Sequence, residues 1–127
     1  MKFIQSDNLP QAIGPYSPAV KVNGMIYTSA QVPVNLDGSL VENDIKIQTR
    51  QVLSNLKTLL EDANSGMESV IKVSVYLKNI DDFGIVNVLF AEAFKDHKPA
   101  RSTISAKDLP LNSLIMIDCI ATETDYH

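Results

Sequence analysis

The sequence predicts an α+β fold in which two helices pack on one face of a mixed six-stranded sheet. Helical spacing of apolar residues runs through 43–63, strict alternation runs through 70–78, and a second apolar helical stripe covers 83–94. The expected order is β-β-α-β-α-β-β, and a further N-terminal strand is an open alternative. With 127 residues and 45% hydrophobic content, we expect one domain spanning residues 1–127.

The first third of the chain predicts a β-hairpin. Val20–Tyr27 carries Asn23-Gly24 between β-forming residues, which is a strong signal for a tight hairpin turn. Asp37-Gly38 marks a second turn.

The first helix is expected over Asn43–Ala63, with Asn43 or Asp44 as its N-cap and Gly66 as its stop. Its apolar stripe follows three- and four-residue spacing: Ile45, Val52, Leu53, Leu56, Leu59, Leu60 and Ala63. A strand should follow over Val70–Lys78, because apolar and polar residues alternate there.

The second helix is expected to begin at a cap formed by Asp81 or Asp82 and to end at Pro99. Its core-facing stripe is Phe83, Val86, Phe90, Ala93 and Phe94. Two more strands should follow, over Arg101–Ala106 and Leu114–Thr122, separated by a turn at Leu109–Asn112.

The last strand carries apolar residues on both faces. Alternation places Met116, Asp118 and Ile120 on one face and Ile117 and Cys119 on the other. Two helices can cover only one of these faces, so we expect further copies of the chain to cover the second.

Composition narrows the function classes. Cys119 is the only cysteine, so neither an intrachain disulfide nor a cysteine-rich zinc site can form, which fits a reducing compartment. The net charge of -4 disfavours a nucleic-acid partner. No membrane-length apolar stretch and no secretory apolar region at the N-terminus occur, so no membrane partner is expected and the cytoplasm is the expected location.

Arg101 is the most informative polar residue. It begins a predicted strand directly after Pro99-Ala100 and shares a face with Thr103. Its planar guanidinium matches a carboxylate, so a half-buried arginine here needs either a partner acid or an anionic ligand. For a lone arginine, a structural ion pair or a charge reaching solvent is the more frequent explanation.

Two weaker candidates lie in the first third of the chain. Tyr16 lies between Pro15 and Pro18, which hold the backbone and leave the hydroxyl available, although a loop tyrosine more often packs on the core. Ser29-Ala30 ends a predicted strand, where small residues allow a ligand to approach the backbone; a simple strand end is an equal alternative.

Metal and nucleophile chemistry are not supported. His97 and His127 have no nearby cysteine, so we interpret both as solvated and expect no metal. Ser17, Ser29 and Ser102 lack a base partner in the sequence, and no phosphate-cradling glycine loop occurs. Acids near helix ends, such as Asp62 and Asp82, are explained by capping and dipole effects.

Five segments in order resemble the RidA (YjgF) family. They are Ala12-Ile13-Gly14-Pro15-Tyr16-Ser17, Thr28-Ser29-Ala30-Gln31-Val32-Pro33, Val70–Lys78 with Asp81-Asp82-Phe83, Pro99-Ala100-Arg101-Ser102, and Ile117-Asp118-Cys119-Ile120-Ala121. Each is weak alone, but together they span nearly the whole chain.

The resemblance implies a chorismate-mutase-like fold, a homotrimer with ligand sites between subunits, and hydrolysis of enamines and imines such as 2-aminoacrylate to 2-keto acids and ammonia without a cofactor. By the same resemblance, Arg101 and Tyr16 would be the catalytic residues. Arg101 would bind the substrate carboxylate, and Tyr16 would close the pocket from a neighbouring subunit. Ser29, Ala30, Asn87, Thr103 and Met116 would line the pocket.

The chain departs from the family pattern where the chemistry is done. Ala30 and Thr103 replace a glycine and a cysteine, and the loop before Pro99 is shorter. More importantly, the glutamate that the family uses to hold the attacking water falls on Met116. A thioether cannot accept a proton, and Asp118, on the same face, lies two residues or ~6.6 Å further along the strand.

Three hypotheses follow, with imine hydrolysis first. The second is a non-catalytic trimer that binds 2-keto acids or related small carboxylates, since Arg101 is kept while the water-holding acid is not. The third is the endoribonuclease or translation-inhibitor role also attached to the family. The net charge of -4 and the absence of a paired-histidine site disfavour this third role.

Overall fold

The computed structural model describes residues 1–12 and 14–124. Ile13, within the first family-like segment, and His127, interpreted above as solvated, lie outside the described residues. None of the helices within the described ranges has the length and apolar character needed to cross a membrane.

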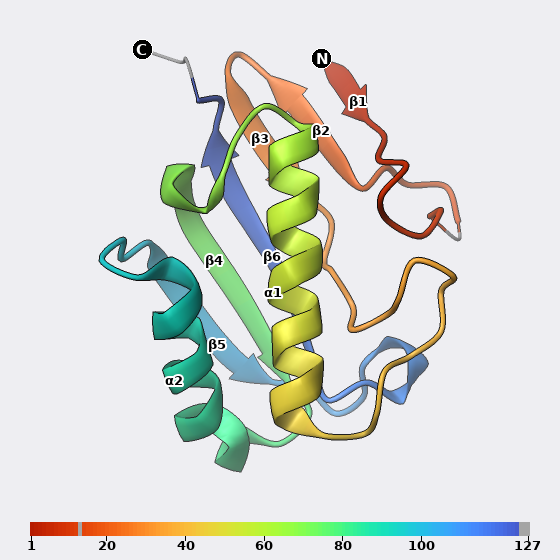
Figure 1. Ribbon diagram of the computed structural model, residues 1–127, viewed down its shortest axis with the longest axis vertical. Helices are drawn as coiled ribbons and strands as arrows, with labels where there is room; N and C mark the ends of the chain where they lie inside the picture. Colours follow the sequence, from red (N-terminus) through yellow and green to blue (C-terminus); the bar gives the residue numbers. More distant parts are fainter. Residues whose placement is uncertain (13, 125–127) are drawn as a thin grey trace.

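Six strands form one mixed sheet in the order β1-β2-β3-β6-β4-β5 (Figure 1). The strands are β1 (Lys2–Ile4), β2 (Ala19–Val22), β3 (Met25–Thr28), β4 (Val70–Leu77), β5 (Ala100–Ser105) and β6 (Ile115–Thr122). Only β4 and β5 pair in parallel, and β5 is an edge strand. The α+β class, the mixed sheet and the additional N-terminal strand are therefore confirmed.

Both helices, α1 (Ile45–Asp62) and α2 (Phe83–Phe94), lie on the same face of the sheet (Figure 1). The core lies between them and the sheet, where alternate strand residues such as Val73, Val75, Ile117 and Cys119 are buried. Short 3₁₀ turns at Met67–Ser69, Ile80–Asp82 and Pro110–Asn112 connect these elements. Within residues 1–12 and 14–124, nothing covers the opposite face of the sheet.

The uncovered side, which we call the open face, is largely apolar. The strand register places partners such as Val20 and Tyr27, or Tyr76 and Met116, side by side on it. Its other apolar members are Phe3, Val22, Met25, Ile104 and Ile120. Phe3 is 61% exposed and Ile104 54% exposed, which is unusual for side chains of this kind.

Local signals explain the boundaries that the sequence predicted correctly. Asn23 (φ 51°) and Gly24 (φ 76°) both adopt positive φ, as the two-residue turn between β2 and β3 requires. The Asp44 side chain accepts a hydrogen bond from the Ile47 amide, so Asp44 is the cap of α1.

Two helix-end predictions were wrong, and one, the cap of α2 at Asp81 or Asp82, was confirmed. Helix α1 ends at Asp62, and Asn64 (φ 63°), not Gly66, is the residue that terminates it, because the Asn64 and Ser65 amides turn back to the carbonyls of Glu61 and Leu60. Asp82 occupies the N-cap of α2 but makes no side-chain capping bond. Helix α2 ends at Phe94, well before Pro99, since Lys95 adopts a φ of 56°.

Two polar side chains also differ from their predicted roles. His97 is half-buried, and its Nε2 lies 2.6 Å from the Val70 carbonyl oxygen, so its interpretation as a solvated residue was wrong. Asp62 was explained above by capping and dipole effects at a helix end. Its carboxylate also accepts hydrogen bonds from the Ser6 hydroxyl and the Asn8 side-chain amide. The hydrogen bonds from Ser6 and Asn8 to Asp62 tie the N-terminal segment to α1.

Candidate functional site

Arg101 lies on edge strand β5 and faces α2. Its backbone partner Val73 is fully buried beneath the helices, and partners in a parallel pair share a face. The guanidinium carbon lies 5.0 Å from the ring centroid of Phe90 and 5.2 Å from that of Phe83. Two aromatic rings of α2 therefore hold the charge by cation–π contact.

The guanidinium has no acidic partner among residues 1–12 and 14–124. Within these ranges the one ion pair joins Lys21 and Glu123, at 2.8 Å. No protein acceptor in the same part of the chain receives a hydrogen bond from the Arg101 side chain. The structural ion pair considered for Arg101 is thus not formed, and its donors remain directed at the space beside α2.

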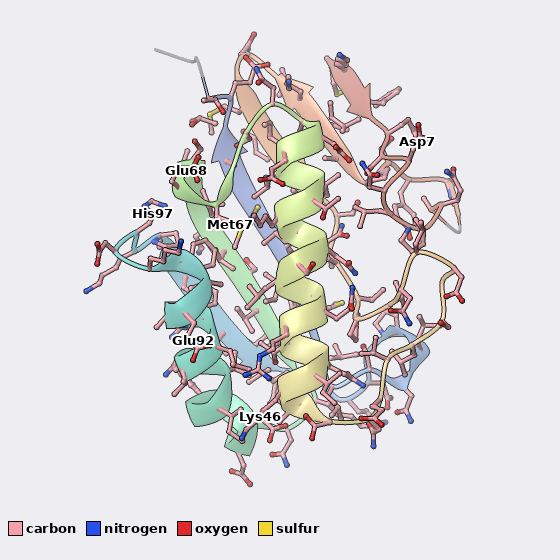
Figure 2. The ribbon with its side chains drawn as sticks, in the orientation of Figure 1. Asp7, Lys46, Met67, Glu68, Glu92 and His97 are labelled. Atoms are coloured by element: carbon pink, nitrogen blue, oxygen red, sulfur yellow. The ribbon has the colours of Figure 1, made fainter. Side chains whose placement is uncertain are left out.

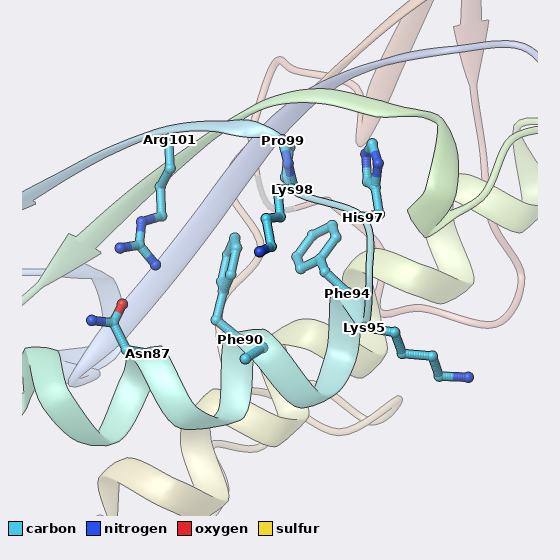
Figure 3. Close-up of a pocket in the computed structure, with 9 residues that line it drawn as sticks. Asn87, Phe90, Phe94, Lys95, His97, Lys98, Pro99 and Arg101 are labelled. Atoms are coloured by element: carbon cyan, nitrogen blue, oxygen red, sulfur yellow. The ribbon is translucent and has the colours of Figure 1, made fainter.

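That space is a cleft of about 370 Å³ between α2 and the start of β5 (Figure 3). Asn87 and Phe90 line it from the helix, and Lys98 and Arg101 from the opposite side. Figure 3 shows Arg101 extending toward Asn87, and Lys98 extending toward the helix beyond Phe90. The cleft therefore offers one amide and two cations above an aromatic floor.

The tight turn after α2 forms one rim of this cleft. The Lys95 amide donates to the Ala91 carbonyl at 2.8 Å, and the His97 amide donates to the Phe94 carbonyl at 3.0 Å. The His97 ring closes the turn against the start of β4, next to the Met67–Ser69 turn (Figure 2). The bond to Val70 fixes the segment that carries Lys98.

Of the predicted site residues, Arg101 and Asn87 are brought together in this cleft. Thr103 lies two residues further along the same face of β5 and is half-buried beside Val75. Sequence reasoning missed Lys98 as a site residue and assigned Phe90 only to the core. The helix side of the cleft could have been predicted from residue spacing. Three- and four-residue steps place Phe83, Asn87, Phe90 and Phe94 on one face of the helix.

Tyr16, Ser29 and Ala30 lie elsewhere in the chain. The residue after Ala30, Gln31, bridges to Ile117 of β6, so β4 separates this region from β5. Three strand spacings, roughly 14 Å, lie between Gln31 and Thr103. Within one chain, this second group of residues does not reach the cleft.

The second group is nevertheless held together. The Ser29 hydroxyl donates to the Ser17 carbonyl at 2.6 Å, and the Ser29 amide donates to the Pro18 carbonyl at 2.8 Å. These bonds fix the segment that carries Tyr16, whose side chain is 56% exposed. Tyr16 therefore presents its ring to the surrounding solvent in the isolated chain.

Met116 lies on the open face, on the opposite side of the sheet from Arg101. Its cross-strand neighbour is Tyr76, whose hydroxyl donates to the Asp118 carboxylate at 2.9 Å. This hydrogen bond and partial burial raise the pKa of Tyr76, so the phenol stays protonated. The pair places an acid and a hydroxyl group beside the methionine.

Cys119 is buried on the helix side of β6 and is 2% exposed. Burial raises the pKa of its thiol to about 12, which makes the thiol a core residue and a poor nucleophile. No cluster of three or more histidine, cysteine or acidic residues able to hold a metal occurs in the ranges that the structure covers.

Comparison with known proteins places this fold and these residues in a family of small α+β proteins. The family model described as Endoribonuclease L-PSP matches residues 6–123. A RutC family protein of Pyrococcus horikoshii is 44% identical over 94% of this chain and 96% of its own length. The chain therefore belongs to the Endoribonuclease L-PSP family, which includes the RidA/YjgF proteins, as its five sequence segments predicted.

Two solved structures extend the comparison. The YjgF protein of E. coli superposes with a TM-score of 0.90 and is 37% identical, covering 96% of this chain and 98% of its own. E. coli TdcF, solved with bound serine, gives a TM-score of 0.91 at 30% identity, covering 98% of this chain and 100% of its own.

Proposed function

We propose that this chain hydrolyses small reactive enamines and imines of the 2-aminoacrylate type to 2-keto acids and ammonia. The observation that carries the proposal is Arg101, which is half-buried, held by Phe83 and Phe90, and free of any carboxylate partner in the described residues. A guanidinium in this state matches the carboxylate that all such substrates share.

The reaction asks little of the protein beyond positioning. Water adds to the carbon of the protonated C=N bond, and the resulting carbinolamine loses ammonia to leave a 2-keto acid. A carboxylate fixed by Arg101 would orient the adjacent C=N carbon, and orientation alone can supply a large part of the rate gain. The serine bound to TdcF is a small molecule with a carboxylate beside its amine-bearing carbon, which supports this substrate class.

We further propose that the site is completed between the subunits of a homotrimer. The open face supports this assembly because it exposes Phe3, Tyr27 and Ile104 with no covering layer. Tyr16, Ser29, Ala30 and Met116 would then reach the Arg101 cleft from a neighbouring copy. Light scattering should give a particle of three times the 14.0 kDa chain mass, whereas a stable 14.0 kDa monomer would contradict the proposal.

The attacking water needs a hydrogen-bond acceptor near Met116. Asp118, which accepts from Tyr76, is the acid on the open face closest along the strand. A carboxylate has lone pairs beyond the one used by Tyr76, so Asp118 can also accept from water. We propose that the Tyr76–Asp118 pair holds the attacking water, as a glutamate at position 116 would, and that hydrolysis is slower than with that glutamate.

The direct test is to generate 2-aminoacrylate from serine with a dehydratase and to follow pyruvate release with and without this protein. We expect acceleration by the wild type and loss of at least tenfold in kcat/KM on Arg101→Ala, corresponding to about 1.4 kcal/mol of transition-state stabilisation. No acceleration by the wild type, or an unchanged rate in Arg101→Ala, would overturn the proposal.

Met116 favours one alternative, a trimer that binds 2-keto acids without turning over their imines. The same preparation decides between the two functions. Binding of pyruvate that depends on Arg101, together with no acceleration of 2-aminoacrylate decay, would establish the binding function in place of the hydrolase.

The family description also names an endoribonuclease. The chain carries a net charge of -4, and the ring of His97 is engaged with the Val70 carbonyl. Both features disfavour RNA cleavage. RNA degradation that persists in Arg101→Ala and is lost on further purification would identify a contaminant.

A further inference from the structure

The Arg101 cleft contains a second cation whose role the proposed function does not explain. Lys98 and Arg101 both line the cleft and both extend toward α2 (Figure 3). Lys95 also touches the rim, but its side chain points away from the cleft in the same view. Lys98 and Arg101 are therefore the two charges that a ligand in the cleft would meet.

The charge of this cleft is opposite to that of the whole chain. None of its nine lining residues is acidic, although acidic residues outnumber Lys and Arg in the sequence by 15 to 11. Within residues 1–12 and 14–124, neither Lys98 nor Arg101 has an ion-pair partner. One monocarboxylate would neutralise only one of the two charges.

The lining between the two cations is apolar. The Phe90 ring stands between Arg101 and Lys98 in Figure 3, with Ala91, Phe94 and Pro99 completing the surface. The two residues are three positions apart, so their backbones are separated by at most about 10 Å. Because both side chains extend into one cleft, the space between their charged ends suits a short aliphatic chain with an anionic group at each end.

We propose that this cleft selects 2-imino and 2-keto acids that carry a second anionic group, as derived from acidic amino acids. Arg101 holds the carboxylate next to the reacting carbon, Lys98 pairs with the distal group, and the methylenes between them lie on Phe90. The proposal rests on the proposed function for the position of the reacting carbon.

Binding of 2-ketoglutarate and 2-ketobutyrate, measured by titration calorimetry on the full-length protein, tests this selectivity. We expect 2-ketoglutarate to bind about fivefold more tightly, the scale of one partly exposed ion pair, with the preference shrinking as salt is raised. Lys98→Met keeps the length of the side chain and should abolish the preference by weakening 2-ketoglutarate binding more than 2-ketobutyrate binding. Lys46→Met, which removes an exposed lysine of α1 outside the cleft, is the matched control and should keep the preference for 2-ketoglutarate.

Phosphohydroxypyruvate, a keto acid with a distal phosphate, separates the two kinds of distal anion. Tighter binding of the phosphate ligand than of 2-ketoglutarate would overturn the assignment to dicarboxylates. Equal affinity for 2-ketoglutarate and 2-ketobutyrate, or a preference that survives in Lys98→Met, would overturn the inference as a whole.

The corresponding imines, made by amino-acid oxidases from glutamate and 2-aminobutyrate, distinguish this inference from the proposed function. Hydrolysis of both imines at equal kcat/KM would contradict the selectivity alone. A Lys98-dependent binding preference without hydrolysis of either imine would contradict the proposed function and leave the selective anion site in place.

Discussion

At the scale of single residues, the environment of Arg101 indicates that a positive charge alone is not enough for ligand binding. The rings of Phe83 and Phe90 hold the guanidinium by cation–π contact, and its N–H groups can make two parallel hydrogen bonds to one carboxylate. A lysine at this position would keep the charge but lose the planar fork and much of the stacking. The site therefore depends on the identity of this residue and not only on its sign.

The first prediction concerns Arg101→Lys. We expect a loss of about tenfold in affinity for pyruvate or 2-ketobutyrate, because one bidentate contact is replaced by a point charge. Calorimetric titration measures the affinity, and the thermal midpoint controls for folding. Affinity equal to that of the wild type would show that the carboxylate binds elsewhere.

The second prediction concerns Met116, the position where an acid is missing. Met116→Glu should raise kcat for 2-aminoacrylate hydrolysis by at least tenfold, since a correctly placed general base contributes on the order of 10² or more. Met116→Gln matches glutamate in size but cannot accept the proton, so it should stay near the wild-type rate. Equal kcat values in the two variants would argue against water activation at this position.

The third prediction concerns Cys119, whose burial raises the pKa of its thiol to about 12. The unfolded thiol ionises near ~8.5, so ionisation favours the unfolded chain as the pH rises from about 9 toward 12. The stability advantage of the wild type over Cys119→Ala should be full at pH 8 and should shrink across this range. Urea denaturation at several pH values measures it, and a constant difference would contradict the assignment.

At the scale of elements, ends were harder to predict than interiors. The alternation and helical stripes identified β4, α1 and α2 because periodic burial extends over many residues. The stop of α1 was misplaced because Gly66 is the usual left-handed residue, yet Asn64 tolerates the same φ of 63°. The end of α2 depends on Lys95, a residue type that gives no warning of a positive φ.

The fourth prediction tests the cap of α1. Asp44→Ala should lower the free energy of unfolding by about 1 kcal/mol, because the Ile47 amide loses its acceptor. Asn43→Ala is the control, since the neighbouring Asn43 is exposed and does not occupy the cap. Denaturant unfolding measures both variants, and equal losses would show that the hydrogen bond to Asp44 does not stabilise the helix.

At the scale of the whole molecule, the candidate site residues of one chain form two separate groups. Arg101 and Asn87 face α2, whereas Met116 lies on the open face and Ala30 lies across the sheet from β5. The family resemblance named candidate members of both groups, and their role stays a prediction. Their division could not be predicted from one sequence, because it depends on the strand order and on the face that each residue takes.

Lys98 is a cleft residue that could not be predicted from the sequence. It lies in a turn with no periodicity, and only the packing of α2 against the start of β5 brings it beside Arg101. Self-association stays a prediction from the two-sided apolar pattern of Ile115–Thr122, and the open face is the surface that it would use.

The central claim is that the two groups complete one another between copies of the chain. Arg101→Ala removes the anchor from one group, and Ala30→Trp fills the approach to the other, so each variant alone should be inactive toward 2-aminoacrylate. In a mixed trimer with cyclic symmetry, one interface in three joins two intact groups. With equal amounts of the two variants, about three quarters of randomly assembled trimers are mixed, so co-expression should restore about one quarter of the wild-type rate per trimer. Activity no greater than that of the separate variants would contradict the claim.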